Sequence, residues 1–322
     1  MDVIALVAPP VDPAVVQSAY AALLGPEFRV SVFGSQADVS DDVAGTAVAC
    51  VAAAGCTVDA RLFKRAPALK LVQIPGHGFD HVSVTDAETA GVAVATVASS
   101  GAEAHTVAEM ALLLAGVAGR RIMQGDRFVR DGNWGPLLML QQGVFELAGK
   151  TLGIVGLGRI GRELATRATA FGMRVVYFDV VKAETDLEFM QLDDLLAAAD
   201  VVSLHAPLTP ATRFLINERT LSLMKPTAVL VNTARGPLVD AHALADALRE
   251  GRLRAAAIDV FDAEPPGPDH PLLGLDNVVL SPHMAGVTAD SILRILAAAF
   301  ENVRRLYRGE PLHDVLPAGA EH

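Results

Sequence analysis

The chain has little cysteine, few aromatic residues, a deficit of basic residues and no long apolar run, and each shortage excludes a class of protein. The only two cysteines, Cys50 and Cys56, are too few for a fold stabilised by disulfides over 322 residues, and their spacing fits no CxxC redox or zinc motif. The balance of 26 Lys and Arg against 37 Asp and Glu gives −11, which argues against a nucleic-acid partner bound through a broad basic face. The longest apolar stretch, residues 110–119, is far short of the ~20 residues of a membrane span.

The N-terminal residues and the overall composition favour a globular protein of the cytoplasm. Residues 1–10 have no basic region and too short an apolar segment for a secretory signal peptide. Hydrophobic residues make up 52% of the chain but aromatic residues only 5%, so the cores must consist mainly of Ala, Val and Leu. At roughly 150 residues per domain, the length predicts two domains. We expect a cytoplasmic protein with no membrane or nucleic-acid partner, in which both cysteines are inert buried side chains.

Short β-branched runs alternate with Ala-rich helical runs throughout the chain, which is typical of parallel βαβ units. The first series predicts strands at residues 3–8, 28–32, 46–51, 69–74 and 92–95, helices at 13–24 and 60–66, and a long helix at 105–121. The second predicts strands at 151–155, 174–178, 201–204, 228–232, 256–261 and 278–281, helices at 160–171, 192–199 and 241–249, and a final helix at 290–307. Between them, residues 125–149 carry the only tryptophan, Trp134, and are predicted to be irregular. The pattern predicts an α/β fold with doubly wound parallel sheets.

One glycine motif predicts where a dinucleotide binds. Gly156, Gly158 and Gly161 follow an apolar strand and open a predicted helix, in the GxGxxG pattern. The first glycine permits a tight turn, the second lets a pyrophosphate approach the backbone, and the third lets the helix pack on the strand. The N-terminus of that helix offers N–H groups and a positive dipole end to the phosphates. Asp179, at the end of the next strand, would bind the adenosine ribose hydroxyls and repel a 2′-phosphate, so the predicted cofactor is NAD rather than NADP.

Three polar residues follow strands of the second series, at the sheet edge where open α/β sheets place their active sites. They are Arg235, Glu264 and His283. Hydride transfer between an alcohol and a nicotinamide needs a group that moves the hydroxyl proton, and His283 suits this task at neutral pH. Glu264 beside it would orient the ring and favour its protonated form, while Arg235 would bind a substrate carboxylate. Each residue alone could be an ordinary strand-end residue, but their shared sheet edge favours a catalytic set.

Several segments together point to one family. They are Gly149-Lys150-Thr151-Leu152-Gly153-Ile154-Val155, His205-Ala206-Pro207-Leu208-Thr209-Pro210-Ala211-Thr212, Asn232-Thr233-Ala234-Arg235-Gly236, and the segments around Glu264 and His283. With them the sequence resembles the D-isomer-specific 2-hydroxyacid dehydrogenases, notably glyoxylate and hydroxypyruvate reductases, along nearly the whole chain. The resemblance implies that Arg235 binds substrate, His283 is the general acid/base and Glu264 is its partner. It also implies NAD contacts from Arg159, Ile160, Asp179, Pro207, Thr212, Thr233, Ala234 and Asp259.

The resemblance further implies how the chain is organised. A discontinuous, flavodoxin-like substrate domain would consist of residues 1–100 and 289–322, and a Rossmann NAD-binding domain of residues 101–288. It suggests a homodimer built from the helix near His105 and the segment around Trp134.

A glycine loop in the first domain also matches the family. In relatives, backbone N–H groups of this loop hold the substrate carboxylate, which maps here to His77 and Gly78. His77 and His81 are not interpreted as metal ligands, because no carboxylate-rich cluster accompanies them and the glycine spacing already has an explanation.

The chain departs from some relatives in ways that bear on its substrate. Glu103 stands where many relatives carry Asn, and its carboxylate would disfavour a second negative charge on the substrate unless it points away. Ile74 takes the place of a basic residue usual in phosphoglycerate-type relatives, and formate-type relatives lack the acid that Glu264 supplies. These features favour reduction of glyoxylate, hydroxypyruvate or another small 2-keto acid, without ranking them. The alternative is an NAD-sensing scaffold similar to the transcriptional corepressors that share the fold.

Overall fold

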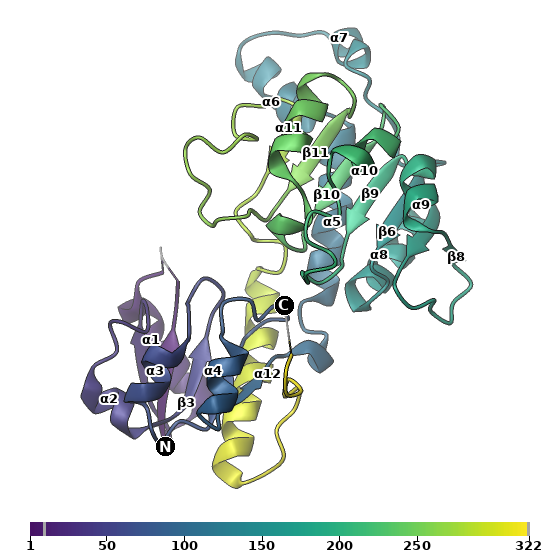
Figure 1. Ribbon diagram of the computed structural model, residues 1–322. Coiled ribbons are helices and arrows are strands. Elements are labelled where there is room, and N and C mark those ends of the chain that lie inside the picture. Colours follow the sequence, from purple (N-terminus) through teal and green to yellow (C-terminus); the bar gives the residue numbers. More distant parts are fainter. Residues whose placement is uncertain (9–10, 321–322) are drawn as a thin grey trace. The chain divides into compact units, whose positions relative to one another are not determined.

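The computed structural model describes residues 1–8 and 11–320. The chain divides into two compact units, Met1–Glu103 with Thr288–His322 (unit 1) and Ala104–Val287 (unit 2), each with its own parallel sheet (Figure 1). Residues 9–10 and 321–322, which the predicted substrate domain includes, lie outside the described residues. Among the described helices, none is both long and apolar enough to cross a membrane.

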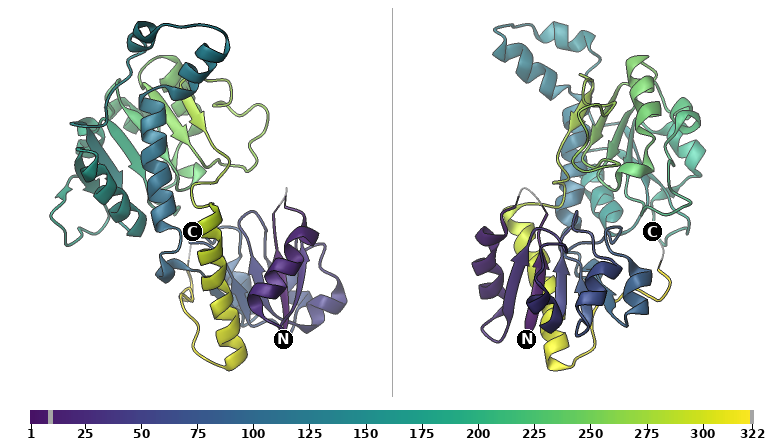
Figure 2. Two further views of the ribbon diagram at one scale, coloured as in Figure 1. Left: turned by 180° about the vertical axis from the view of Figure 1, so that it is seen from behind. Right: turned by 60° about the vertical axis from the view of Figure 1, so that its left-hand side comes forward.

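Unit 1 is a five-stranded parallel sheet in the order β2-β1-β3-β4-β5, with helices on both faces. Its strands are β1 (Asp2–Leu6), β2 (Arg29–Phe33), β3 (Ala47–Ala52), β4 (Leu71–Gln73) and β5 (Ala93–Ala95). Its helices are α1 (Pro13–Leu24), α2 (Asp41–Thr46), α3 (Ala60–Arg65), α4 (Val84–Thr89), the 3₁₀ turn η1 (Ala98–Ser100) and α12 (Ala289–Arg308). Helices α1 and α12 cover one face of this sheet, and α2, α3 and α4 pack on the other (Figure 2).

Local signals set the ends of the longer helices of unit 1. The Asp12 side chain caps α1, and Gly25, with φ of 114°, follows its last residue. Helix α12 begins with a capping box in which Thr288 and Ser291 bond each other's backbone N–H groups, and it ends at Gly309 in the left-handed conformation. These caps agree with the predicted positions of both helices to within two residues.

The last helix and the segment after it complete the sheet of unit 1. Val315 forms an antiparallel bridge with Ala95 of the edge strand β5. A buried hydrogen bond of 2.7 Å joins the Asn302 amide of α12 to the Gln73 side chain of β4. Unit 1 therefore depends on contacts between its N-terminal segment, Met1–Glu103, and the segment that begins at Thr288.

The core of unit 1 also holds both cysteines. Cys50 and Cys56 are free and buried among aliphatic side chains. Burial raises the pKa of both thiols, to about 11 for Cys56. Raised thiol pKa values disfavour the reactive thiolate, in line with the predicted inert role.

Unit 2 is a seven-stranded parallel sheet in the order β12-β11-β10-β9-β6-β7-β8. Its strands are β6 (Thr151–Val155), β7 (Arg174–Phe178), β8 (Glu188–Phe189), β9 (Val201–Leu204), β10 (Val229–Asn232), β11 (Ala255–Ile258) and β12 (Val278–Leu280). Its helices are α5 (Ala104–Gly119), α6 (Ile122–Arg130), α7 (Pro136–Gln141), α8 (Arg159–Ala170), α9 (Leu192–Ala198), α10 (Glu218–Leu223), the turn η2 (Gly236–Leu238) and α11 (Ala241–Arg249). The strand order reverses at β6, which creates a topological switch point between β6 and β9.

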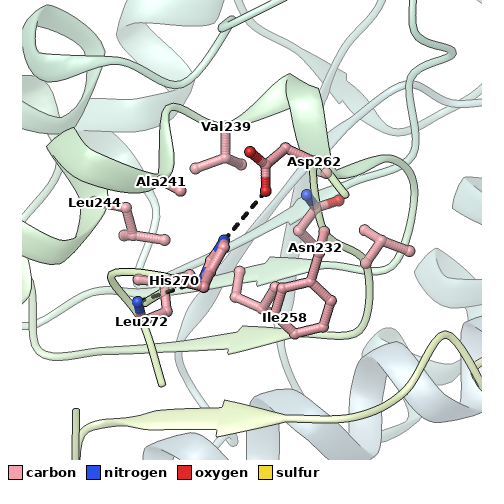
Figure 3. Close-up of a pocket in the computed structure, with 11 residues that line it drawn as sticks. Asn232, Val239, Ala241, Leu244, Ile258, Asp262, His270 and Leu272 are labelled. Carbon is pink, nitrogen blue, oxygen red and sulfur yellow. Dashed lines mark hydrogen bonds and ion pairs between the residues drawn. The ribbon is translucent and has the colours of Figure 1, made fainter. Parts of the chain in front are cut away.

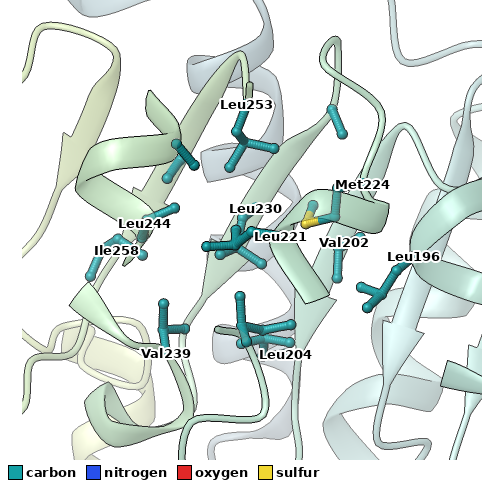
Figure 4. Packing of buried hydrophobic residues seen from close by; sticks show 14 of the residues in the cluster. Leu196, Val202, Leu204, Leu221, Met224, Leu230, Val239, Leu244, Leu253 and Ile258 are labelled. Carbon is teal, nitrogen blue, oxygen red and sulfur yellow. The ribbon is translucent and has the colours of Figure 1, made fainter. Parts of the chain in front are cut away.

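Aliphatic side chains fill both faces of the second sheet. Helices α5 and α8 cover one face, and α9, α10 and α11 cover the other. Figure 4 shows the latter layer, where Leu204 and Leu230 of the strands meet Leu221 and Leu244 of the helices. Burial on both faces explains why these strands read as continuous apolar runs. The packed sheet holds in place the starting points of the loops that follow the strands.

The prediction of an irregular segment at 125–149 is wrong in part, because α6 and α7 occupy much of it. Neither helix buries a residue in the described chain. Neither therefore has the buried apolar stripe by which a helix is usually recognised in a sequence. Gly125 lies inside α6, and Pro136 opens α7 at the first helical position, where proline is tolerated.

Smaller corrections concern short elements and strand ends: the strand predicted at 3–8 ends at Leu6, and the one predicted at 69–74 is Leu71–Gln73. Helices α2, α4 and α10 and the two-residue strand β8 were not predicted, so the second sheet has seven strands rather than six. The strand predicted to reach residue 261 ends at Ile258. The next residue, Asp259, still donates its amide to the Asn232 carbonyl of β10 at 3.0 Å, and its side chain bonds to the loop after β12.

Candidate active site

The glycine turn between β6 and α8 is shaped to admit a ligand. Gly156 has a φ of +97°, and a Cβ there would lie 2.8 Å from backbone atoms of His205 and Ala206. A Cβ on Gly161 would lie 2.4 Å from the carbonyl oxygen of Gly156. A Cβ on Gly158, by contrast, would meet no described atom within 4 Å. These contacts fit a tight turn, close helix packing and, at Gly158, open space where a pyrophosphate could approach.

The groups around this turn suit an anionic dinucleotide. Gly158 is the N-cap of α8, and among the described residues no side chain caps the first turn, so its N–H groups can bind phosphate. The Asp179 carboxylate after β7 accepts a hydrogen bond of 2.8 Å from the Leu157 amide, which holds it beside the turn. A carboxylate in this place suits ribose hydroxyls and disfavours a 2′-phosphate.

Two buried polar atoms near the switch point lack a hydrogen-bond partner in the described part of the chain. They are Nδ1 of His205, after β9, and Oγ1 of Thr233, after β10. The other ring nitrogen of His205 lies 2.8 Å from Ser203 Oγ, and burial lowers the pKa of His205 to about 4, so the ring is neutral at physiological pH. Because buried polar atoms rarely stay unsatisfied, both fit a site that receives a polar ligand such as NAD.

The residues predicted to be catalytic follow three neighbouring strands of this sheet. Arg235 comes after β10, Glu264 after β11 and His283 after β12. Nδ1 of His283 lies 2.6 Å from Oε2 of Glu264, and the Phe261 amide donates to Oε1 of the same carboxylate at 3.0 Å. Both carboxylate oxygens are thereby fixed. The imidazole keeps Nε2 for a reacting group, and its side chain is 39% exposed.

Opposed pKa shifts accompany this pair. The hydrogen bond to Glu264 raises the pKa of His283 above its ordinary value, although burial and the positive charge of Arg235 act against it and the charge of Asp259 assists it. Burial alone would raise the pKa of Glu264, but the hydrogen bonds from His283 and the Phe261 amide outweigh it and lower that pKa. The arrangement favours an ionised carboxylate beside a protonated imidazole, which is the state a general acid needs.

Asp259 holds the loop that carries His283. Its carboxylate is fully buried and accepts hydrogen bonds from the Ser281 hydroxyl at 2.5 Å and from the Met284 and Ala285 amides at 3.0 and 2.9 Å. The Asp259 carbonyl accepts from the His283 amide at 2.7 Å. Within this frame His283 adopts φ of +50°, which is uncommon for a residue other than glycine. A strained backbone held by a buried charge is typical of a functional site.

The other residues implied by the resemblance lie on the same side of unit 2 or in the loop of unit 1. Arg159 and Ile160 open α8, Pro207 and Thr212 lie in the turn after β9, and Thr233 and Ala234 follow β10. The Thr212 hydroxyl is used within its own turn, since it donates to the Pro207 carbonyl at 2.7 Å. His77 and Gly78 follow β4 in unit 1. Among the described residues, no group of three or more His, Cys, Asp or Glu could hold a metal ion.

The sequence interpretation missed residues that organise the site. The side chain of Asn232, at the end of β10, donates to the Arg235 carbonyl at 2.8 Å and accepts from the Ala234 amide at 3.0 Å. His205 offers a buried ring nitrogen after β9, and the Ser281 hydroxyl donates to the Asp259 carboxylate. A polar residue at the end of an otherwise apolar strand is the signal that could have identified Asn232 and Ser281.

Unit 1 contains a histidine–glutamate pair at its glycine loop, between His77 and Glu103. Nδ1 of His77 contacts Oε1 of Glu103, and the two side chains are 30% and 15% exposed. Glu103 therefore points toward the predicted substrate loop of its own unit rather than into solvent. The sequence alone left this orientation open.

Known proteins resemble both units. The sequence model of the D-isomer specific 2-hydroxyacid dehydrogenase NAD-binding domain matches residues 110–285. A glyoxylate reductase of Aeropyrum pernix is 44% identical over 265 residues, which cover 79% of this chain and 78% of that protein. A D-3-phosphoglycerate dehydrogenase of Mycobacterium tuberculosis is 42% identical over 271 residues, covering 82% of this chain but only 50% of that protein. The crystal structure of the TT0316 protein of Thermus thermophilus covers 98% of this chain and 100% of its own, with 36% identity and a TM-score of 0.86.

Proposed function

This chain belongs to the D-isomer-specific 2-hydroxyacid dehydrogenase family, and we propose that it reduces glyoxylate, hydroxypyruvate or another 2-keto acid of similar size. It is an NAD-dependent oxidoreductase that acts between 2-keto acids and D-2-hydroxy acids. In the proposal, unit 1 is the substrate domain and unit 2 the NAD-binding domain. Reduction is the proposed direction, since a relative at 44% identity is named a glyoxylate reductase.

The observation that carries the proposal is the 2.6 Å contact between His283 and Glu264. When bound, NADH supplies the hydride for the carbonyl carbon. His283 donates a proton from Nε2 to the carbonyl oxygen, while Glu264 stabilises the protonated ring through Nδ1 and fixes its orientation. The raised pKa of His283 keeps this acid available around neutral pH.

Substrate binding is assigned to Arg235 and to the glycine loop of unit 1. Arg235 is held by its neighbours, because its Nη1 donates to the Ala234 carbonyl at 2.7 Å and its own carbonyl accepts from Asn232. A guanidinium can bind a carboxylate and polarise the adjacent carbonyl. The backbone N–H groups of His77 and Gly78 provide further donors for the carboxylate in this proposal.

The pair of Glu103 and His77 narrows the substrate class. If His77 is neutral the pair carries a negative charge, and if it is protonated the pair is neutral, so in neither state does it offer a net positive charge. A second anionic group near the loop would therefore meet no net positive charge there, and beside a neutral His77 the repulsion from the Glu103 carboxylate would cost about 1 kcal/mol or more. This disfavours phosphorylated and dicarboxylic keto acids and favours small monoanions.

We also propose a homodimer formed through the surface of α5, α6 and α7. The segment of α6 and α7 extends away from the body of unit 2 (Figures 1 and 2) and exposes large apolar side chains, among them Met123, Trp134 and Leu137. Trp134 is 84% exposed and Leu137 is 73% exposed in the single chain. An apolar patch of this kind is typical of a protein–protein interface.

A cytoplasmic location belongs to the same proposal, and the free Cys50 and Cys56 fit a reducing compartment.

The test is the loss of NADH absorbance with a panel of keto acids. The panel contains glyoxylate, hydroxypyruvate, pyruvate, 2-oxoglutarate and phosphohydroxypyruvate, each assayed with NADH and with NADPH. We expect the highest kcat/KM for glyoxylate or hydroxypyruvate with NADH. A higher value for the phosphorylated substrate, or no turnover with any keto acid, would contradict the proposal. Sedimentation of the purified chain tests the dimer separately.

A further inference from the structure

A second histidine is buried close to the catalytic pair but takes no part in the proposed proton transfer. His270 lines a small cavity of about 20 Å³ together with Asn232, Gly236 and Phe261 (Figure 3). Its side chain is only 8% exposed. A polar ring this well buried is normally hydrogen-bonded on both nitrogens, and its partners show what it holds together.

Both ring nitrogens of His270 have a contact. Nε2 lies 3.2 Å from Oδ1 of Asp262, and Nδ1 accepts from the Leu272 amide at 3.4 Å (Figure 3). The acceptor role of Nδ1 leaves the proton on Nε2, so a neutral ring can satisfy both contacts at once. Asp262 and His270 flank the part of the loop between β11 and β12 that carries Glu264. The contact between them therefore joins the two sides of this part of the loop.

The ring of His270 also packs edge-on against Phe261, with ring centroids 5.3 Å apart and an interplanar angle of 85°. The amide of Phe261 is the group that fixes Oε1 of Glu264 at 3.0 Å. From the other side, Gly236 presses on the peptide between Phe261 and Asp262, since a Cβ on Gly236 would lie 2.0 Å from the Phe261 carbonyl carbon. Phe261 is thus held through its ring by His270 and at its carbonyl group by the turn that follows Arg235.

From these contacts we infer that His270 and Asp262 are positioning residues for the catalytic pair. His270 holds the Phe261 ring, its contact with Asp262 joins two points of the loop that carries Glu264, and the Phe261 amide in turn directs the Glu264 carboxylate at Nδ1 of His283. Loosening this support misaligns Glu264, so His283 loses part of the interaction that keeps it protonated. The inference rests on the proposed roles of Glu264 and His283.

The test uses five variants of the full chain, one of them at the exposed His242 of α11 as control site. His270→Phe keeps the ring packing but removes both nitrogen contacts, and Asp262→Ala removes the partner from a position that is 59% exposed. Asp262→Asn retains an acceptor oxygen for Nε2. His242→Phe is the matched control. For each variant, kcat and KM for keto-acid reduction, the pH profile of kcat/KM, the NADH dissociation constant and Tm are measured.

We expect His270→Phe and Asp262→Ala to lower kcat about ten-fold with little change in NADH affinity. We expect the alkaline limb of their pH profiles to move to lower pH by roughly half a unit, because the pKa of His283 falls as Glu264 loosens. Asp262→Asn should restore most of the kcat and the position of the limb, and His242→Phe should change neither.

A fall in Tm with an unmoved pH profile would overturn the inference, because it would show a structural role only. If His270→Phe fails to fold, the exposed substitution Asp262→Ala decides the outcome alone. Glu264→Gln separates this inference from the proposed function. If Glu264→Gln itself leaves the pH profile unmoved, the proposed function fails; if it moves the profile while Asp262→Ala does not, only the positioning role fails.

Discussion

In each unit a histidine at the predicted site contacts a glutamate through Nδ1, yet these two pairs, His283–Glu264 and His77–Glu103, are built differently. In unit 2, the carboxylate of Glu264 is fixed on its second oxygen by the Phe261 amide, and the loop of His283 is fastened to the buried Asp259. In unit 1, the pair of His77 and Glu103 joins a glycine loop to the residue just before α5. The contact between the side chains is similar, but its surroundings are not.

The difference shows that a histidine–glutamate contact alone does not identify a general acid. In the pair of unit 2, the pKa of His283 is raised and the pKa of Glu264 is lowered, and the His283 backbone adopts the left-handed conformation. Glu103 is the more buried acid, at 15% exposure against 36% for Glu264. We therefore assign proton transfer to the pair in unit 2 and substrate selection to the pair in unit 1, and the following experiments test this division.

The largest difference should appear when each histidine is removed. His283→Ala should lower kcat about a thousand-fold, because it removes the proposed proton donor. His77→Ala should lower it less than about ten-fold, since its backbone N–H remains. Steady-state kinetics with NADH and fluorescence titration of NADH binding measure both effects. Near-normal turnover of His283→Ala, or equal losses in the two variants, would remove the distinction.

Arg235→Ala should raise KM for the keto acid about a hundred-fold, because a charged hydrogen-bond partner of the substrate is lost. The NADH dissociation constant should stay close to that of the parent chain. The control is Arg249→Ala, which removes a half-exposed guanidinium from α11. An unchanged KM in Arg235→Ala would refute the substrate-binding role.

Glu264→Gln should move the pH dependence of reduction. Glu264 raises the pKa of His283, so the protonated acid persists to higher pH in the parent chain. Loss of the carboxylate charge lowers that pKa, and the alkaline limb of kcat/KM should move to lower pH by about one unit. Glu103→Gln should leave the limb in place. Movement of the limb in both variants would mean that the two pairs are coupled.

The smallest effect concerns substrate choice. Glu103→Gln should raise kcat/KM for phosphohydroxypyruvate relative to hydroxypyruvate about five-fold, which corresponds to about 1 kcal/mol of removed repulsion. Glu109→Gln, which neutralises an exposed acid of α5, provides the control. An unchanged ratio would show that Glu103 does not select against a second anion.

Much of the fold follows from the sequence because buried parallel strands read as apolar runs. The strands at 151–155, 174–178 and 201–204 match the predicted ranges residue for residue. The short helices were not predictable in this way. Helix α10, for example, has six residues and begins with a capping box of Asn217 and Thr220. Isolated helices of this length are unstable, so packing in the folded unit determines them.

The candidate site, like the fold, was predictable from the sequence only in part. The positions of Arg235, Glu264 and His283 after successive strands predicted that they share one sheet edge, and their strands are neighbours in the structure. The supporting contacts of Asp259 and His270 were not predictable. The contacts of Asp259 join two loops that follow different strands, and those of His270 depend on how one long loop folds back on itself, so no residue pattern encodes either. The same holds for the contact of Glu103 with His77.

The discontinuity of unit 1 has a consequence for synthesis on the ribosome. Residues 104–287 form one uninterrupted stretch, so unit 2 can bury its core as soon as that stretch has emerged. Unit 1 must wait, because one face of its sheet is covered by α12 and its edge strand pairs with Val315. During translation the first hundred residues therefore expose apolar surface while the unit that follows them folds, and this interval is when a chaperone would have the most to protect.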